Sequence, residues 1–591
     1  MCAGEGLISE NAMRVLQARY LRRDTEGKII ETPQQLFERV ARAIAEAELL
    51  HGTAADARFW EERFHRMMAS LDFLPNSPTL MNAGTSLGQL SACFVLPIED
   101  TMESIFGTLR DAALIQRSGG GTGFSFSRLR PAGDPVASTG GSSSGPVSFM
   151  RIYDCATENI KMGGRRRGAN MGVLRVDHPD IEDFVHAKSD GVSFRNFNLS
   201  VGATDEFMSA VESGGDLELR HPANGRVVRT VSASKVFDDI CDAAWSTGDP
   251  GLIFLDTIAR ANPLPACGRI EATNPCGELP LFPYESCNLG SINLVHFVGH
   301  ENGAATVDYL GLRRQIHDAV RFLDDVISVN RFPLEVIARQ TLANRKIGLG
   351  VMGFAELCIL LGISYASEQA VSLAQEMMEF IAREARIASI HLAEQRGVFP
   401  NWSASMYPGR GLGLRNATLT SIAPTGTISI IAGTSSGIEP LFALAYRRRH
   451  VLGDQTLAEL NPLLQRHLDR LGQNTSKAIA CISSTGRLST DSPERNLFVT
   501  ALEISAEQHL RVQAAFQKHI DNAVSKTVNL PAEASSKDVA QAYRLAYQLG
   551  CKGVTIFRYG SKSETMLELG LGETPEQREQ FTKCDPEACR L

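Results

Sequence analysis

The sequence predicts an α/β protein with a mainly helical region at its N-terminus. From about Cys93 to Tyr559, short apolar runs such as SACFVLPI and GVTIFRYG alternate with longer helical patterns such as SLAQEMMEFIAREARIASIHLAEQ. Alternation of this kind is typical of α/β architectures. The first 85 or so residues lack the strand-like runs and are predicted to form a separate packing domain.

The two ends of the chain differ in character. The run TPQQLFERVARAIAEAELL begins with Thr32 as a helix N-cap, with Pro33 in the first turn and Gln35 completing a capping box. The last segment, 561–591, is polar, poor in apolar periodicity and ends with Cys584 and Cys589, so we predict a mobile tail. The predicted domains are therefore 1–85, 86–560 and 561–591.

The composition narrows the class of protein. The 591 residues are 43% hydrophobic and 21% charged, with a formal net charge of −8, which is ordinary for a globular protein and argues against nucleic acid as a partner. There is no apolar stretch of membrane-spanning length and no secretory layout at the start, so we expect a cytoplasmic protein with no membrane partner. Twelve cysteines in such a chain predict thiols, ligands or catalysts rather than a disulfide framework.

The stretch NPCGE places Asn274, Cys276 and Glu278 at alternating positions, so an extended loop would point all three side chains to one side. The alternative is a buried cysteine in a turn made by Pro275 and Gly277. A neighbouring carboxylate raises the pKa of a thiol, and no histidine lies nearby in the sequence, so a Cys–His nucleophile fits poorly. Glu278 is better suited to act as a base toward a substrate hydroxyl beside a hydrogen-bonding Asn274. A thiol that stays protonated can instead lose a hydrogen atom, which makes radical chemistry a candidate.

Two further runs contain groups that could bind phosphate. APTGTISIIAGTSSGIEP offers hydroxyls, backbone N–H groups and a following helix N-terminus, at Thr425, Gly426 and Thr427. KMGGRRRGANMG concentrates guanidinium groups between glycines, at Arg165, Arg166 and Arg167. The second run suits phosphate or base recognition, or simply a solvated surface turn.

Four other patterns have a plainer interpretation. Residues 348–353 match the dinucleotide fingerprint formally but lack its context, and QRSGGGTGFSFS lacks the lysine of a phosphate-binding P-loop. Asp100, with Glu103 three residues later, could be a helix N-cap. Cys584 and Cys589 offer only two metal ligands, so we expect no metal there and consider disulfide exchange more suitable.

Taken together, these runs resemble those of ribonucleotide reductases, above all the adenosylcobalamin-dependent class II enzymes. Besides NPCGE, the resemblance includes NSPTLMNAG, SACFVLP, GGRRRGANMGVLRVDHPDI, ESCNLGSINL, RKIGLGVMG, APTGTISIIAGTSSGIEP and FRYGSK, in the family's order over nearly the whole chain. It implies a ten-stranded α/β barrel of two five-stranded halves, with loop 274–278 as a finger through its centre, plus the N-terminal helical domain.

The resemblance also implies catalytic roles. Cys276 would carry a thiyl radical that takes hydrogen from ribose C3′, Glu278 would deprotonate the 3′-hydroxyl, and Asn274 would bind the ribose hydroxyls. The dithiol that becomes a redox disulfide would be Cys93–Cys287. Tail residues Cys584 and Cys589 would reopen it by exchange before a thioredoxin-like partner reduces them.

Binding residues are implied in the same way. The substrate, a ribonucleoside diphosphate or triphosphate, would contact Ser77, Ala92, Cys93, Asn274, Thr425, Gly426, Thr427 and Ile428. A dNTP or ATP effector would contact Asp100, Arg130, Arg165, Arg166 and Arg167, and residues 163–172 would relay its identity to the substrate base. The helices after Asp100 and around Tyr153 resemble a four-helix dimer contact, so we expect a homodimer.

The classes of this family differ in how the radical on the catalytic cysteine is generated. The sequence lacks the residues that two of these classes use. Phe557 and Arg558 stand where class I enzymes have a tyrosine pair, and phenylalanine has no O–H to lose. Gly560 lacks the context of a class III glycyl radical. Class II remains, with adenosylcobalamin as the cofactor, although no D-x-H-x-x-G cobalamin motif occurs. The alternatives are a class I large subunit that needs a metal-containing partner, a catalytically silent nucleotide-binding relative, and a plain dithiol oxidoreductase.

Overall fold

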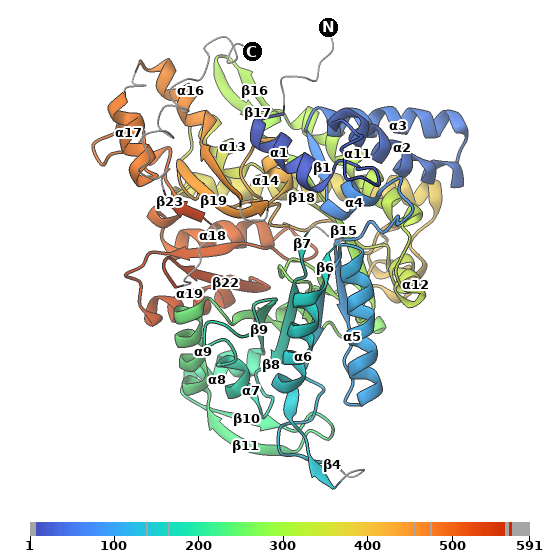
Figure 1. The fold of residues 1–591 in the computed structure, drawn as a ribbon, viewed down its shortest axis with the longest axis vertical. Helices are drawn as coiled ribbons and strands as arrows, with labels where there is room; N and C mark the ends of the chain where they lie inside the picture. Colours follow the sequence, from blue (N-terminus) through green and yellow to red (C-terminus); the bar gives the residue numbers. More distant parts are fainter. Residues whose placement is uncertain are drawn as a thin grey trace.

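The computed structural model of the chain is shown in Figure 1. It describes residues 8–136, 140–162, 166–452, 455–472, 476–561 and 567–569. Helices surround one large, mostly parallel β-sheet, and the N-terminal helices pack at one end of the molecule. The predicted α/β class and the helical N-terminal region are therefore confirmed.

The N-terminal region consists of α1 (Glu10–Arg19), α2 (Pro33–Ala45) and α3 (Ala54–Ala69), with a short 3₁₀ turn, η1 (Glu46–Leu50), between the last two. The predicted capping box is present, because Thr32 N–H donates to Gln35 Oε1 at 2.9 Å and Thr32 Oγ1 accepts from Gln35 N at 3.3 Å. The apolar face of α2 is buried in the same core as the long helix α11 (Tyr309–Val329).

Five parallel strands form the first part of the large sheet. They are β2 (Cys93–Leu96), β3 (Gly121–Ser125), β8 (Asn170–Arg175), β9 (Phe197–Ala203) and β12 (Gly251–Phe254), paired in that order. Nearly all their residues are buried, which is typical of parallel strands covered on both faces.

The second part of the sheet is also parallel. β15 (Glu285–Asn293) pairs with β18 (Ile347–Met352), and β21 (Thr527–Leu530) pairs with β22 (Gly553–Arg558). Single parallel bridges at Leu349–Thr420 and Ile422–Val524 connect β18 through segment 420–422 to the residues just before β21.

The two parts meet along antiparallel pairs at both sides. β15 runs antiparallel to β2, and β12 runs antiparallel to β22. A short edge strand, β1 (Phe73–Pro75), adds to β15. Followed from strand to strand, the pairings lead from β2 through β12, β22, β18 and β15 back to β2.

The other elements cover this sheet or connect its strands. The larger helices are α5 (Met102–Arg117), α6 (Gly145–Asn159), α9 (Ala233–Thr247), α14 (Glu368–Arg396), α18 (Ala506–Gln517) and α19 (Ser536–Gln548). The shorter helices are α4 (Ser77–Asn82), α7 (Ile181–Val185), α8 (Asp205–Ser213), α10 (Leu255–Ala261), α12 (Glu335–Asn344), α13 (Phe354–Leu360), α15 (Ile428–Ala432), α16 (Pro462–Arg470) and α17 (Ser476–Thr485). Outer hairpins are β10 (Asp216–Arg220) with β11 (Val227–Ser232), β16 (Val298–Glu301) with β17 (Ala304–Val307), and β19 (Ala445–Leu452) with β20 (Gln455–Leu460).

A buried ionic network joins the N-terminal helices to the rest of the fold. Arg396 of α14 contacts Glu48 of η1 at 2.6 Å and Asp325 of α11 at 2.5 Å, and Arg345 contacts Asp324 at 2.8 Å. Burial alone would raise the pKa of Asp324, but the surrounding arginines, Arg345 first, lower it to about 2. Removing one partner of a buried ion pair leaves an uncompensated charge, so a substitution in this network would destabilise the packing of η1 against α11 and α14.

A small hairpin lies against the inner face of the sheet. β13 (Ala272–Thr273) pairs antiparallel with β14 (Pro280–Leu281), and its residues share an inner core cluster with Cys93 and Cys287. A Cβ atom on Gly123 of β3 would lie 1.8 Å from Thr273 O. A Cβ atom on Gly121 would likewise lie 2.9 Å from the Pro275 side chain. These two glycines of the run GGGTG therefore admit the hairpin, which explains a run that the sequence left without a function.

The glycine pattern at 348–353 also has a packing role. It belongs to the buried strand β18, and α13 begins directly after it. A Cβ atom on Gly350 would lie 2.3 Å from Ser421 O, so this glycine admits the neighbouring chain segment. The interpretation as a tight-core element, rather than a dinucleotide site, is the one that this close approach supports.

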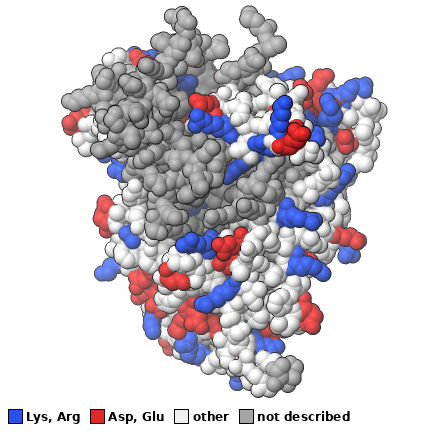
Figure 2. Space-filling model, viewed as in Figure 1, with Lys and Arg blue, Asp and Glu red and all other residues white. Residues whose placement is uncertain are grey.

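The surface is mixed in charge. On the described part of the face in Figure 2, basic and acidic side chains are interspersed rather than gathered into patches of one sign. Within the described ranges, none of the helices combines the length and apolar character needed to cross a membrane. The same ranges contain no group of three or more His, Cys, Asp or Glu side chains that could hold a metal ion.

The close approach at Gly123 can be tested by Gly123→Ala. We expect a loss of about 1–3 kcal/mol in the free energy of unfolding, because the new methyl group overlaps backbone that cannot move away cheaply. Chemical denaturation measures this loss. Gly107→Ala is the matched control: nothing lies within 4 Å of its added Cβ, and alanine inside a helix is favoured over glycine. Equal stability of the two variants would contradict the packing argument.

Candidate active site

Residues 274–278 form a tight turn at the tip of the β13–β14 hairpin. Gly277 N–H donates to Asn274 O at 3.1 Å, and Leu279 N–H donates to Asn274 Oδ1 at 3.0 Å. Gly277 has a φ of +81°, which glycine adopts without strain. The turn is present, but the alternative interpretation of a buried cysteine is wrong, because Cys276 is exposed.

Glu278 lies behind the turn in a different environment. It is 1% exposed, and its Oε2 has no hydrogen-bond partner among the described residues. Burial raises the pKa of this carboxyl group to about 7, against a smaller lowering by the Asn274 side chain. Its backbone carbonyl is held by Ala523 N–H at 2.9 Å and by Ser421 Oγ at 3.0 Å. A buried carboxyl that titrates near neutral pH is suited to general-base chemistry.

Cys93 and Cys287 face each other across the antiparallel pair of β2 and β15. Directly opposed residues in antiparallel strands have Cα separations of about 4.5–5.5 Å, within the range that a disulfide spans. Both thiols are reduced and buried. Burial raises the pKa of each, with further raising of Cys93 by Glu278 and of Cys287 by Glu285. They are therefore held as protonated thiols.

Asn274 connects the turn to this dithiol. Its Nδ2 donates to Cys93 Sγ at 3.0 Å, and its side chain is 1% exposed. On the other side of the turn, Asn198 Nδ2 of β9 donates to Pro275 O at 2.8 Å. The structure thus brings together all five predicted catalytic residues: Cys276, Glu278, Asn274, Cys93 and Cys287.

The predicted phosphate loop, 425–428, runs into the five-residue helix α15. Thr425 has an unusual φ of +51°, and its Oγ1 accepts from Gly437 N–H at 2.7 Å. Gly426 is exposed, Thr427 is half-buried and Ile428 is buried. One turn of helix has little macrodipole, so the hydroxyls and backbone N–H groups are the useful ligands of this loop.

Two residues beside this loop were not found from the sequence. Arg19 Nη1 of α1 donates to Thr427 Oγ1 at 3.4 Å, and Tyr20 OH lies 2.7 Å from Ser77 Oγ. Ser77 and Thr427, both predicted to bind the substrate, therefore lie beside two consecutive residues at the end of α1. No motif could have revealed Arg19, because it lies 408 residues from its partner. Ala92, the other predicted substrate residue, precedes β2 and is half-buried.

The predicted effector residues Asp100 and Arg130 are in direct contact. Arg130 Nε lies 2.7 Å from Asp100 Oδ2, and Arg130 N–H donates to Asp100 Oδ1 at 3.2 Å. The plainer interpretation, in which Asp100 is the N-cap of α5, is wrong. Thr101 is the cap, because its hydroxyl accepts from Ser104 N–H at 3.1 Å.

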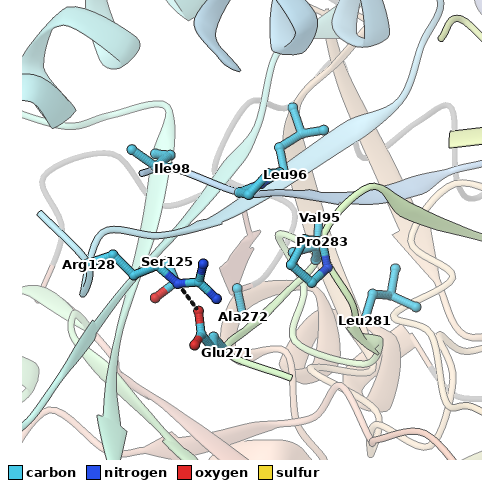
Figure 3. Close-up of a pocket in the computed structure, with 10 residues that line it drawn as sticks. Val95, Leu96, Ile98, Ser125, Arg128, Glu271, Ala272, Leu281 and Pro283 are labelled. Carbon is cyan, nitrogen blue, oxygen red and sulfur yellow. Dashed lines mark hydrogen bonds and ion pairs between the residues drawn. The ribbon is translucent and has the colours of Figure 1, made fainter. Parts of the chain in front are cut away.

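A small pocket lies near this pair, at the base of the hairpin rather than at its tip (Figure 3). Figure 3 shows Arg128 and Glu271 facing each other on one side, with a separation of 3.0 Å between Nε and Oε2. The remaining lining is largely apolar: Val95, Leu96, Pro97, Ile98, Ser125, Ala272, Leu281 and Pro283. The pocket does not contain the predicted catalytic residues.

Some predicted residues lie outside the described part of the chain. These are Arg165 and both tail cysteines, Cys584 and Cys589. Arg166 and Arg167 form the short strand β7 (Arg166–Arg167), whose backbone pairs with β6 (Lys161–Met162). The contact of the arginine run with an effector stays a prediction.

Comparisons with known proteins identify the family of the chain. Residues 91–557 match the model of the ribonucleotide reductase barrel domain, and residues 7–88 match that of the ribonucleotide reductase all-alpha domain. A structure of the Actinobacillus ureae class Id ribonucleotide reductase alpha subunit superposes with a TM-score of 0.77, covering 95% of this chain and 99% of that one. At 24% identity this likeness concerns the fold alone.

Two sequence relatives are more similar. A protein of Thermoplasma acidophilum is 47% identical over 97% of this chain and 82% of its own length. One of Mycobacterium tuberculosis is 52% identical over 95% of this chain and 80% of its own length. Both are called vitamin B12-dependent ribonucleoside-diphosphate reductases. Two domain models and these relatives cover almost the whole chain, and we conclude that it belongs to the ribonucleotide reductase family, in the group of vitamin B12-dependent ribonucleoside-diphosphate reductases.

Proposed function

We propose that this chain reduces ribonucleoside diphosphates to 2′-deoxyribonucleoside diphosphates by thiyl-radical chemistry, with adenosylcobalamin as its cofactor. The observation that carries the proposal is the arrangement at the hairpin tip. An exposed Cys276 stands in front of a buried, titratable Glu278, and Asn274 connects them to the opposed pair of Cys93 and Cys287. The names of the two relatives support the choice of cofactor and of diphosphates.

We also propose that the sheet is a ten-stranded barrel of two five-stranded parallel halves, with loop 274–278 as its central finger. The strand pairings that lead from β2 back to β2, antiparallel only at the two junctions, support this architecture. The helical domain would cover 1–85, the barrel 86–560 and the tail 561–591. The barrel wall would shield the radical from solvent.

The first chemical steps would involve Cys276 and Glu278. The Cys276 thiyl radical would remove the hydrogen atom from C3′ of the ribose, while Glu278 accepts the proton of the 3′-hydroxyl. Asn274 would hold the ribose hydroxyls. Because both Cys93 and Cys287 stay protonated in their buried positions, they can deliver hydrogen rather than act as nucleophiles.

The reduction step would convert the C2′–OH bond to C2′–H. The 2′-hydroxyl leaves as water, the two thiols supply two electrons and two protons, and a Cys93–Cys287 disulfide forms. Cys276 finally returns the hydrogen atom to C3′ of the product and is left as the thiyl radical again. The balance is one ribonucleotide and one dithiol giving one deoxyribonucleotide, one water and one disulfide.

The residues around Cys276 fit a bulky radical source. Cys276 is exposed, although Pro275 before it is buried and Gly277 after it is half-buried, and nothing lies within 4 Å of the Cβ position of Gly277. Pro275, Gly277 and Asn198 would form the surface against which the cofactor is held. When bound, adenosylcobalamin supplies a one-electron oxidant through homolysis of its cobalt–carbon bond. Phe557 in β22 supports this source, since it cannot relay a radical through an O–H group.

The tail would regenerate the dithiol. Its described part, β23 (Leu567–Leu569), pairs antiparallel with β19, so the chain is attached there before it continues. Cys584 is the fifteenth residue after Leu569, and that length of extended chain reaches about 50 Å. Such a tether would allow Cys584 and Cys589 to enter the barrel, exchange with the Cys93–Cys287 disulfide and then meet a thioredoxin-like reductant.

Regulation and assembly would involve helices α5 and α6 and the residues beside them. The contact between Asp100 and Arg130 lies at the start of α5, where a deoxynucleotide effector or ATP would bind. Met102, Phe106 and Ile152 are exposed apolar side chains on α5 and α6, with exposures of 56%, 44% and 39%. Covering these side chains with a second copy would form a homodimer.

The cofactor assignment predicts activity of the chain alone. With a ribonucleoside diphosphate, adenosylcobalamin and a dithiol, we expect deoxynucleotide to form, as measured by chromatography. Cys276→Ser should abolish the product and leave effector binding unchanged, because an alcohol O–H is not a usable hydrogen donor here. Cys267→Ser changes an exposed cysteine elsewhere and should remain active. Product formation only after addition of a metal-containing second subunit would contradict the proposal.

The raised pKa of Glu278 predicts the pH dependence. As kcat/KM requires the ionised base, it should rise with pH through about 7, and Glu278→Gln should lower it by about 100-fold or more. Stability gives an independent readout. Folding favours the neutral form of Glu278. The free energy of unfolding should therefore fall as the pH rises from the ordinary pKa of this carboxyl group, 4.5, to its raised pKa of about 7. Glu278→Gln should therefore raise the melting temperature more at pH 8 than at pH 4.

If the tail cysteines regenerate the dithiol, their loss should stop repeated turnover and leave the first turnover intact. Cys584→Ser should limit reduction by a thioredoxin-like protein to about one product per chain, because the buried Cys93–Cys287 disulfide is not reopened. Rapid-quench measurement of the first turnover should give the wild-type amplitude. Cys481→Ser, at a cysteine of α17 remote from the tail in sequence, is the control. Continued turnover with Cys584→Ser would argue against the shuttle.

A further inference from the structure

The loops that would bind the substrate phosphates contain no positive charge of their own. Residues 67–109, which include Ser77, have no lysine or arginine, and neither do residues 417–442, which include Thr425 and Thr427. A nucleoside diphosphate carries two to three negative charges near neutral pH, and neutral donors alone bind such a group less strongly than a guanidinium does. A cation from elsewhere in the chain would therefore strengthen binding of the diphosphate.

Helix α1 brings such a cation to the phosphate loop. Its last residue is Arg19, whose Nη1 lies 3.4 Å from Thr427 Oγ1. Arg19 is half-buried, so its guanidinium group is partly shielded from water on the side where it contacts the loop. The helix is held in place by its apolar face, since Val15 and Leu16 are fully buried.

The next residue makes a second contact with the same site. Tyr20 is 2% exposed, and its hydroxyl lies 2.7 Å from Ser77 Oγ. Tyr20 N–H donates to Leu16 O at 2.9 Å, which keeps the residue in line with α1. The last residue of α1 and its C-cap residue therefore contact the two chain segments that would bind the phosphates.

We propose that Arg19 binds the terminal phosphate of the ribonucleoside diphosphate and that Tyr20 is a positioning residue, which orients the Ser77 hydroxyl toward the same diphosphate. The inference rests on the proposed function. Arg19 would move its hydrogen bonds from the Thr427 hydroxyl to phosphate oxygens, leaving Thr427 to donate to the phosphate as well. The N-terminal helical domain would then contribute directly to substrate recognition.

A purely structural role for Arg19 makes a different prediction. A basic residue in the last turn stabilises a helix through its macrodipole, and any cation there would serve equally. A phosphate-binding role needs the forked guanidinium at its particular reach. Arg19→Lys separates the two roles, because it keeps the charge at the end of α1 and removes the fork.

The experiment measures binding of cytidine diphosphate, cytidine monophosphate and cytidine to the purified chain by equilibrium dialysis, without cofactor. For Arg19→Gln we expect the Kd of the diphosphate to rise about 10- to 100-fold, with a much smaller change for the monophosphate and none for the nucleoside. Arg19→Lys should give an intermediate loss. Tyr20→Phe should weaken diphosphate binding by about threefold, as expected for one neutral hydrogen bond.

Arg14→Gln is the matched control, because Arg14 lies on the same helix and pairs with Glu10 at 2.5 Å on the exposed side. It should bind all three ligands as the wild type does. In the cofactor-loaded enzyme, Arg19→Gln should raise KM for the diphosphate and leave kcat within about twofold, as for a contact made equally in the ground and transition states.

Two results would overturn the inference: an unchanged diphosphate affinity in Arg19→Gln, or an equal loss for diphosphate and nucleoside, which would indicate a structural defect. Failure of the proposed function has a different signature. In that case the wild-type chain would bind the diphosphate in an Arg19-dependent way and yet form no deoxynucleotide with adenosylcobalamin and a dithiol.

Discussion

The candidate site depends on one steric constraint, the passage of the β13–β14 hairpin along the inner face of the sheet. The hairpin can lie there because β3 has no side chain at Gly123, where a methyl group would overlap Thr273 O. This contact sets the depth of the tip, and the tip sets the positions of Asn274, Cys276 and Glu278. A shallower hairpin would separate Asn274 from Cys93, whose Sγ now accepts a hydrogen bond from Asn274 Nδ2 at 3.0 Å.

Burial then gives each group its chemistry. The same removal of water raises the pKa of Glu278 to about 7 and keeps the thiols of Cys93 and Cys287 protonated. A carboxyl that titrates near neutrality can accept a proton, and a neutral thiol can give up a hydrogen atom. Cys276 differs because it is exposed at the tip. One hairpin therefore presents an accessible thiol on one side and a dry, proton-accepting environment on the other.

The N-terminal helices are coupled to this site through two kinds of contact. The buried ionic network of Glu48, Asp325 and Arg396 holds η1 against α11 and α14. At the other end of the same region, α1 places Arg19 and Tyr20 beside the phosphate loop and Ser77. The helical region is thus more than a packing domain, because its position determines which groups lie beside the candidate phosphate loop and Ser77.

The sequence by itself determined the features that depend on neighbouring residues. The capping box at Thr32, the turn at Pro275 and Gly277, the candidate phosphate loop at 425–427 and the α/β alternation all follow from local backbone preferences and periodicity. Motif order also indicated the family. Such rules act over a few residues, so they hold wherever the segment is placed in the fold.

Tertiary structure decided what depends on residues far apart in the chain. It made Cys276 exposed rather than buried, and it set Cys93 opposite Cys287 through the register of β2 and β15. Asp100, a possible helix cap from the sequence, pairs with Arg130 instead, because Thr101 caps the helix. Arg19 reaches Thr427 across 408 residues. Contacts of this range are set by how helices and strands pack, which no local pattern of residues specifies.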